Sequence, residues 1–303
     1  MEWLEISLRV IPEAAEAVAE VLSRYAPQGV AFDLGAEQGR GPLTVRAYLA
    51  VDEEIEARRR QVEEALWHLH YIWEAIPAPE FSVIADRDWT AGWKETIPIL
   101  HLGRRVVIRP SWKPYMPVGD ELVLELDPGM AFGTGLHPTT QLCVEALEET
   151  VQPGMRVLDI GTGTGILAFL AAKMGAAEVV AVDNDMSAVT AARRNASANH
   201  VAHTVRLVFG SLPDVGGIYD VVFANILAPV IIDMAQNGLA SRVRPGGLVV
   251  ASGILIEQEN EVIRALEEVG LGLAQRRAKE GWSVLLARRV NTFAVGYPRG
   301  EQG

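Results

Sequence analysis

Cysteine is nearly absent from this chain, and so are the features that would place it in a membrane. The chain has 303 residues and a single cysteine, Cys143, which excludes an intramolecular disulfide and a thiolate cluster for zinc. It contains no run of about 18 uncharged apolar residues, the length that a membrane span requires. Residues 1–5 are acidic and strand-like, without the basic and apolar regions of a signal peptide. We therefore expect a cytoplasmic protein that holds no metal and contacts no membrane.

Positive charge is also scarce, and the deficit is uneven along the chain. The formal net charge is −12. Residues 1–88 hold 8 Arg and Lys against 17 Asp and Glu, whereas the remainder holds 19 against 22. An acidic surface repels nucleic-acid phosphates and attracts basic partners. The first third thus predicts a basic protein partner and no direct nucleic-acid contact, although the same charge also serves solubility.

The length allows about two domains of roughly 100–200 residues each. In residues 1–88 the apolar pattern predicts strands and helices in the order βαββαβ, at 3–10, 12–22, 29–34, 43–51, 53–73 and 81–85. This order is the ferredoxin-like α+β pattern. Because the segment has no Gly-rich loop or reactive cluster, we interpret it as a substrate-recognition domain, with a purely structural domain as the alternative. We assign residues 89–130 to a linker and N-terminal extension of the catalytic domain, and residues 131–303 to that domain.

A glycine-rich turn follows the first strand expected after residue 150. The sequence of residues 159–165 is DIGTGTG, and it leads into a predicted helix. Glycines there allow a tight turn and the close approach of a ligand. A dinucleotide fingerprint would place its third glycine at position 166, which is Ile166, so the spacing argues against a dehydrogenase. Asp-x-Gly-x-Gly-x-Gly instead resembles the first motif of the S-adenosylmethionine-dependent methyltransferases.

Strands and helices alternate beyond this turn, which predicts parallel βαβ units. Strands are expected at 157–160, 179–182, 205–209, 220–224, 248–252, 271–277 and 282–288. Only residues 279–281 separate the last two strands, so we expect this pair to be antiparallel. A parallel sheet with an antiparallel C-terminal hairpin is typical of the Rossmann-like α/β fold of class I methyltransferases.

Ligands of open α/β sheets bind at the carboxyl ends of the strands, so the residues there are site candidates. The first strand delivers Gly161 and Gly163. The second delivers Asp183, expected to accept hydrogen bonds from a ribose, with a turn or N-cap role as the alternative. The fourth ends at Asn225, which resembles the start of the Asn-Pro-Pro-Tyr motif of amino-group methyltransferases, with a helix cap as the alternative. The aromatic residue of that motif is Ala228 here, which favours an aliphatic amine over a nucleobase.

The chemistry explains an asparagine at this strand end. Methyl transfer from a sulfonium is an in-line displacement that needs a neutral nitrogen lone pair. The side-chain oxygen of Asn225 and a nearby backbone carbonyl are expected to accept the amine's hydrogens and to aim that lone pair at the methyl group. Asn225 is therefore the candidate catalytic residue.

A loop rich in glycine and hydroxyl residues precedes a helix expected to begin near Pro138. Thr139, Thr140 and the N–H groups of this helix start are expected to donate hydrogen bonds to a cofactor carboxylate. Phe132 is expected to cover the ligand as a lid. An ordinary helix cap with a mobile loop is the alternative. His137 is the best-placed titratable ring, and we interpret it as structural.

Four segments together resemble the bacterial ribosomal protein L-eleven (L11) methyltransferase family: 126–135 (LDPGMAFGTG), 137–140 (HPTT), 158–168 (LDIGTGTGILA) and 225–228 (NILA). The resemblance spans roughly residues 86–290. It implies a ferredoxin-like substrate-binding domain and an S-adenosylmethionine-dependent domain that releases S-adenosylhomocysteine. It also implies methylation of the N-terminal α-amine and lysine ε-amines of L11, a large-subunit ribosomal protein. The implied cofactor contacts are Thr140, Gly161, Asp183 and Asn225.

Other functions fit parts of the same pattern. A lysine methyltransferase of another protein, such as an electron-transfer flavoprotein subunit, shares the same core. A non-catalytic assembly factor would keep the fold and bind S-adenosylmethionine without using it. For the protein itself we expect a monomer.

Overall fold

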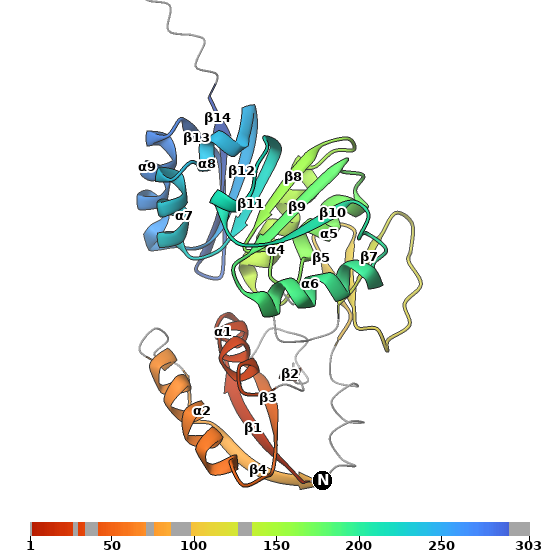
Figure 1. Cartoon of the computed structure of the whole chain (residues 1–303), viewed down its shortest axis with the longest axis vertical. Helices are drawn as coiled ribbons and strands as arrows, with labels where there is room; N and C mark the ends of the chain where they lie inside the picture. Colours follow the sequence, from red (N-terminus) through yellow and green to blue (C-terminus); the bar gives the residue numbers. More distant parts are fainter. Residues whose placement is uncertain are drawn as a thin grey trace, which may run out of the picture.

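Three separate β-sheets organise residues 2–26, 30–33, 42–70, 76–85, 98–126 and 135–290, which are the residues that the computed structural model describes. Figure 1 shows the first sheet with its two helices below the large sheet, and the small third sheet beside the large one. The large and the small sheet lie together. We call the first sheet and its two helices the first unit, and helix α1 is the part of this unit that lies nearest to the other two sheets (Figure 1).

The first sheet is antiparallel, with strand order β2-β3-β1-β4. Its elements are β1 (Glu2–Val10), α1 (Pro12–Ser23), β2 (Val30–Asp33), β3 (Leu43–Ala50), α2 (Ile55–His70) and β4 (Glu80–Ala85). Alternate residues of β1 and β3 are buried together with Val18 of α1 and Val62 of α2, as the period-2 pattern of a sheet covered on one face requires. The ferredoxin-like arrangement predicted from the sequence is confirmed.

The large sheet has seven strands in the order β10-β9-β8-β11-β12-β14-β13. Five strands are parallel neighbours, whereas β14 pairs antiparallel with both β12 and β13. The strands are β8 (Arg156–Ile160), β9 (Glu178–Asp183), β10 (Val205–Phe209), β11 (Tyr219–Asn225), β12 (Val243–Leu255), β13 (Leu271–Lys279) and β14 (Trp282–Arg289). This is the class I methyltransferase sheet, with the antiparallel C-terminal hairpin that the sequence predicted.

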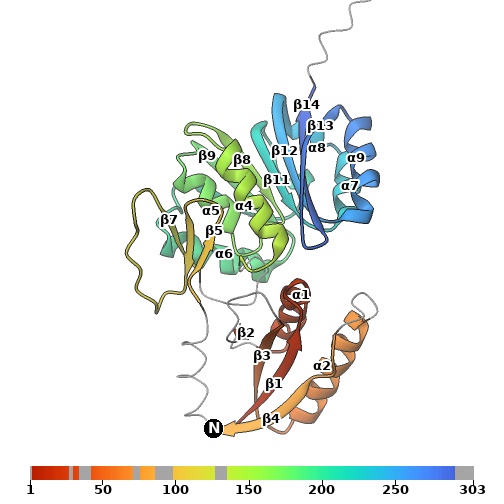
Figure 2. The same cartoon turned by 180° about the vertical axis from the view of Figure 1, so that it is seen from behind.

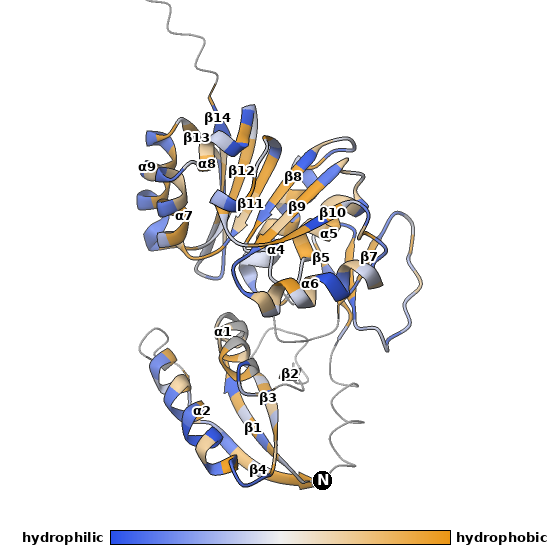
Figure 3. Ribbon diagram, in the orientation of Figure 1, coloured by the Kyte–Doolittle hydropathy of each residue, from blue (hydrophilic) through white to orange (hydrophobic). Residues whose placement is uncertain are grey.

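Helices cover both faces of the large sheet, because its strands are apolar on both sides (Figure 3). Neighbouring residues of β8 point to opposite cores: Val157 packs with one set of helices and Leu158 with the other. The first set is α4 (Pro138–Thr150), α5 (Ile166–Lys173) and α6 (Met186–Ala198). The second set is α7 (Ala228–Gln236), α8 (Leu239–Arg242) and α9 (Glu259–Glu268). The two sets are seen on opposite sides of the sheet in Figure 2.

The apolar pattern of residues 229–240 predicts one continuous helix, and the structure divides it in two. Gly238 has a φ of 106° and separates α7 from α8. That left-handed conformation interrupts a helix and is accessible to glycine at little cost. Apolar periodicity alone continues across the break, because both helices bury residues on the same face of the sheet.

The third sheet is small and contains β5 (Leu100–Leu102), β6 (Val106–Arg109) and β7 (Leu122–Glu125), in that order. Strand β5 was not predicted, because three residues give too short a pattern to recognise. Leu102, Ile108 and Leu124 are buried in the same core as α4 and α5. This part of the expected linker therefore packs as an extension of the large sheet's helical layer.

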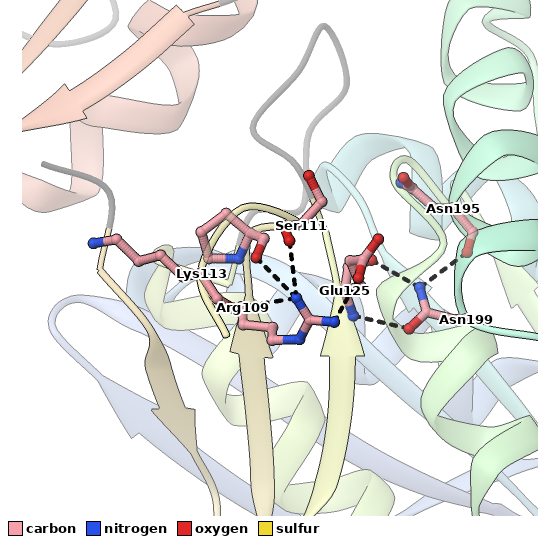
Figure 4. Close-up of polar contacts among 7 residues, drawn as sticks. Arg109, Ser111, Lys113, Glu125, Asn195 and Asn199 are labelled. Carbon is pink, nitrogen blue, oxygen red and sulfur yellow. Dashed lines mark hydrogen bonds and ion pairs between the residues drawn. The ribbon is translucent and has the colours of Figure 1, made fainter. Parts of the chain in front are cut away.

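Two polar side chains fix strand β7 of the small sheet: Arg109 ties it to β6 and the loop after β6, and Asn199 joins it to helix α6 (Figure 4). The guanidinium of Arg109 donates to the carbonyl oxygens of Pro110, Ser111 and Lys113, each at 3.2 Å, and to Glu125 at 2.6 Å. Asn199, the C-cap of α6, accepts from the Glu125 N–H at 2.8 Å and donates to its carbonyl at 2.7 Å. Because α6 begins at the carboxyl end of β9, this contact holds the helix in place from its far end.

None of the helices in the described residues is long and apolar enough to span a membrane.

Candidate functional site

A cavity of about 480 Å³ lies at the carboxyl edge of the large sheet. This volume is within the usual range for small-molecule sites, about 300–1,000 Å³. The ends of four adjacent strands line the cavity with Gly161, Asp183, Asn225 and Gly253, and Ala17 of helix α1 lines it from the first unit. The structure thus brings the predicted strand-end residues together around one space, at the edge where ligands of open α/β sheets bind.

The glycine-rich turn between β8 and α5 is held against the neighbouring strand. The N–H groups of Gly161 and Thr162 both donate to the carbonyl of Val182, at 2.9 and 3.1 Å. The turn passes through left-handed conformations at its three glycines, with φ values of 69°, 55° and 90°, so residues with side chains would be strained there. Gly161 and Gly163 line the cavity, as predicted.

Asp183 has the turn role that the sequence gave as the alternative, and it also lines the cavity. Its Oδ2 accepts from the N–H of Gly163 at 2.9 Å, and its Oδ1 accepts from the N–H of Asp185 at 3.0 Å. These bonds fix the carboxylate at the cavity wall and tie it to the glycine turn. Since a carboxylate oxygen can accept two hydrogen bonds, each oxygen retains capacity to accept a hydroxyl from a ligand.

Asn225 ends β11 and lines the cavity. Its Oδ1 is buried and, within the described part of the chain, has no hydrogen-bond partner. The alternative that Asn225 caps the following helix is wrong, because the N-cap of α7 is Leu227 and no side chain caps this helix. A buried acceptor without a partner costs free energy. The Asn225 oxygen is therefore placed to accept a hydrogen from a ligand that enters the cavity.

The start of α4 differs in detail from the expectation. His137 is the N-cap, and its Nδ1 accepts from the N–H of Thr139 at 3.3 Å and lies 2.7 Å from the Thr139 Oγ1. The Thr139 N–H is thus already used, although Thr139 lines the cavity. The Oγ1 of Thr140 is buried and lacks a partner among the described residues, but Thr140, unlike Thr139, is not one of the residues that line the cavity. Phe132, the expected lid, lies outside the described residues.

Trp282 is a cavity residue that the sequence reasoning missed. It begins β14, and its ring meets the His137 ring edge-on with centroids 4.8 Å apart. An antiparallel strand begins at the edge where its parallel neighbours end. The predicted antiparallel hairpin was therefore sufficient to predict that Trp282, at the start of its second strand, lies at the site.

Asp159 of the glycine motif is buried beneath the turn. Its Oδ2 accepts from the hydroxyl of Thr162 at 2.7 Å, while its Oδ1 has no partner in the described residues. Burial, together with the nearby charge of Asp183, raises the pKa of the Asp159 carboxyl from 3.8 to about 6. The hydrogen bonds from Thr162 and Ala168 act in the opposite direction.

This raised pKa predicts a pH-dependent stability. Between about pH 4 and pH 6 the folded state binds the Asp159 proton more tightly than the unfolded state, so stability falls as pH rises through this window. Asp159→Asn removes the ionisation, so between pH 4 and pH 7 the free energy of unfolding of the variant should rise relative to that of the wild type by about 2 kcal/mol. Urea denaturation at both pH values measures this gain. A difference between the two proteins that stays constant with pH would contradict the assignment.

No group of three or more His, Cys, Asp or Glu side chains within the described ranges is arranged to hold a metal ion. A second cavity, of about 450 Å³, lies at the opposite edge of the large sheet. It contains none of the predicted site residues, and two of its charged side chains, Arg244 and Asp220, form an ion pair with each other.

Comparison with known proteins agrees with this site. The sequence model of the family described as "Ribosomal protein L11 methyltransferase (PrmA)" matches residues 2–290. The ribosomal protein L11 methyltransferases of Chloroflexus aurantiacus and Geobacter metallireducens are 42% and 41% identical to this chain. The matches cover 95% and 94% of this chain, and 98% and 97% of theirs.

Among solved structures, the ribosomal protein L11 methylase of Lactobacillus delbrueckii subsp. bulgaricus is 35% identical. It superposes with a TM-score of 0.59 over 64% of this chain and 98% of its own. The family match covers the first sheet and the large sheet together with their helices. The relatives are matched over nearly their whole length. This chain therefore belongs to the ribosomal protein L11 methyltransferase family.

Proposed function

We propose that this protein transfers methyl groups from S-adenosylmethionine to the N-terminal α-amine and lysine ε-amines of ribosomal protein L11. The observation that carries the proposal is the buried, unpartnered Oδ1 of Asn225 in the same cavity as the glycine turn and Asp183. Membership of the family supports the choice of L11 as substrate.

The cavity residues fit S-adenosylmethionine. Asp183 would accept hydrogen bonds from the ribose, and the glycine turn at Gly161 and Gly163 leaves room beside the backbone. The Thr140 hydroxyl, which has no partner in the described residues, would bind the cofactor carboxylate at the start of α4. We assign Thr139 to the same wall and Phe132 to a lid over it. When bound, the cofactor's sulfonium supplies an activated methyl and a good leaving group.

The chain's own contribution is to orient the amine. The Asn225 oxygen would accept a hydrogen of the neutral amine and direct its lone pair toward the methyl group. Ala228, buried at the start of α7, replaces the aromatic residue that would stack on a flat base. This suits an aliphatic amine. An α-amine has a pKa of about 8 against about 10.4 for lysine, so it is neutral more often at pH 7.

The first unit, residues 1–88, is the proposed recognition domain for L11. Its charge, 8 Arg and Lys against 17 Asp and Glu, favours a basic partner. Helix α1 contributes Ala17 to the wall of the cavity, so a substrate held on this unit would lie near Asn225. We further propose that the protein works as a cytoplasmic monomer on L11 without binding nucleic acid or a membrane.

This charge predicts a salt-dependent interaction. The KM for L11 should rise several-fold between low ionic strength and about 0.5 M salt, because the Debye length falls well below 10 Å over that range. The Kd for the cofactor, which is proposed to bind in the cavity and not on the acidic surface, should change much less. Initial rates measured across a salt series test this. A KM for L11 that is independent of salt would contradict electrostatic recognition.

Calorimetry and transfer assays separate the candidate functions. We expect S-adenosylmethionine to bind and NAD to fail to bind, and labelled methyl groups to appear on L11. Binding of NAD would favour a dehydrogenase. Binding of S-adenosylmethionine without transfer to any protein would favour an assembly factor. Transfer to an electron-transfer flavoprotein subunit in preference to L11 would favour the other lysine methyltransferase.

A further inference from the structure

Ile226 lies between two glycines that belong to different strand ends. A Cβ added to Gly253 would lie 2.2 Å from the carbonyl oxygen of Ile226 and 2.7 Å from its carbonyl carbon. A Cβ added to Gly161 would lie 2.3 Å from the Cγ2 of Ile226. Ile226 thus contacts β12 with its main chain and the cofactor turn with its side chain. We call this Gly161–Ile226–Gly253 contact the Ile226 brace.

Gly253 is the extra residue of a β-bulge. Strand β12 pairs with β11 through Ser252 opposite Asn225, but its register with β14 shifts between Ser252 and Ile254. Gly253 has a φ of 82°, which favours glycine. Bulges of this kind bend a strand and redirect its neighbours next to functional sites.

Hydrogen bonds anchor the bulge on both sides. The N–H of Ile226 donates to the Ser252 carbonyl at 3.0 Å. The buried hydroxyl of Ser252 donates to the carbonyl of Ser283 on β14 at 2.8 Å. The backbone that follows Asn225 is therefore fixed by β12 and β14 rather than by a helix cap.

We propose that Gly253 and Ile226 are positioning residues for methyl transfer, which rests on the function proposed above. The bulge sets the position of the Ile226 backbone, and so that of the adjacent Asn225, while the Ile226 side chain sets the distance to Gly161. Gly161, Asn225, Ile226 and Gly253 all line the cavity. The brace thereby couples the amine-orienting residue to the cofactor turn.

The first test compares two alanine variants with the same backbone strain. Gly253→Ala must move the Ile226 carbonyl by about 1 Å, a displacement that costs on the order of 100-fold in rate. Gly270→Ala is the matched control, because Gly270 also has a φ of 82° but a Cβ there meets nothing within 4 Å. We expect kcat for L11 methylation to be about 100-fold lower in Gly253→Ala than in Gly270→Ala, with the cofactor Kd equal within about 3-fold.

The second test measures only the Kd for S-adenosylmethionine. The Cβ that Gly161→Ala adds would contact only the Ile226 side chain within 4 Å. Gly161→Ala should therefore weaken S-adenosylmethionine binding, and adding Ile226→Ala should restore part of the affinity. The cost of a left-handed alanine at position 161 is the same in both proteins and cancels. In Gly253→Ala the conflict is with main-chain atoms, so Ile226→Ala should restore no activity there.

The outcomes are distinguishable. Equal kcat values for Gly253→Ala and Gly270→Ala would overturn the brace, as would an unchanged cofactor Kd when Ile226→Ala is added to Gly161→Ala. If Gly253→Ala fails to fold, as judged by circular dichroism, the second test decides. If the wild type leaves L11 unmodified, the proposed function fails, while the binding measurements still support or overturn the brace.

Discussion

Replacing Asn225 with alanine is expected to lower kcat for methyl transfer about 100-fold or more. The side-chain oxygen is buried at the cavity wall without a partner in the described residues, so its removal disturbs no internal hydrogen bond that the structure shows. The amine then enters the cavity without the acceptor that directs its lone pair. Single-turnover rates with saturating cofactor measure this loss directly.

Two further variants make the Asn225 result specific. Asn237→Ala, at the exposed C-cap of α7, should leave kcat unchanged. Asn225→Asp keeps the shape but places a carboxylate beside the amine, which would favour the charged ammonium and move the pH–rate profile to higher pH. If Asn225→Ala retains the wild-type kcat, the lone-pair account is wrong.

Replacing Asp183 with alanine should raise the Kd for S-adenosylmethionine by about 10- to 100-fold. Hydrogen bonds to charged groups contribute about 1.5–3 kcal/mol, and the variant also releases the N–H groups of Gly163 and Asp185. Calorimetric titration measures the change. Because Asp183 is proposed to bind the cofactor ribose and not the reacting amine, kcat at saturating cofactor should fall much less than the affinity.

The controls for Asp183 follow from its two acceptor oxygens. Asp183→Asn retains one oxygen and should give an intermediate Kd. Asp233→Ala removes an exposed carboxylate of α7 and should leave the Kd unchanged. A cofactor Kd for Asp183→Ala that matches that of the wild type would show that the carboxylate only holds the turn.

The sequence predicted the elements whose signal is local. Residues 157–160 indicate a buried strand because three of the four are apolar and they precede glycines, and the structure places them in β8. Asp183 and Asn225 were found because each is the first polar residue after such a strand, and parallel strands bring their carboxyl ends to one edge. The antiparallel hairpin was evident because three residues cannot carry a parallel crossover.

Features that depend on contacts between distant segments could not be read in this way. His137 caps its own helix and also packs on Trp282, which is far away in sequence. Gly253 carries no motif, and its importance appears only when the Ile226 backbone lies against it. The contact of Asp183 with the glycine turn likewise depends on the N–H of Gly163, which follows a different strand.

Mass spectrometry of L11 after incubation with this protein and methyl-labelled S-adenosylmethionine tests the central claim most directly. With the wild type we predict labelled methyl groups on the N-terminal α-amine and on lysine side chains, located by peptide mapping. With Asn225→Ala we predict almost none after the same time. Unmodified L11 in the presence of wild-type protein that has bound the cofactor would contradict the account.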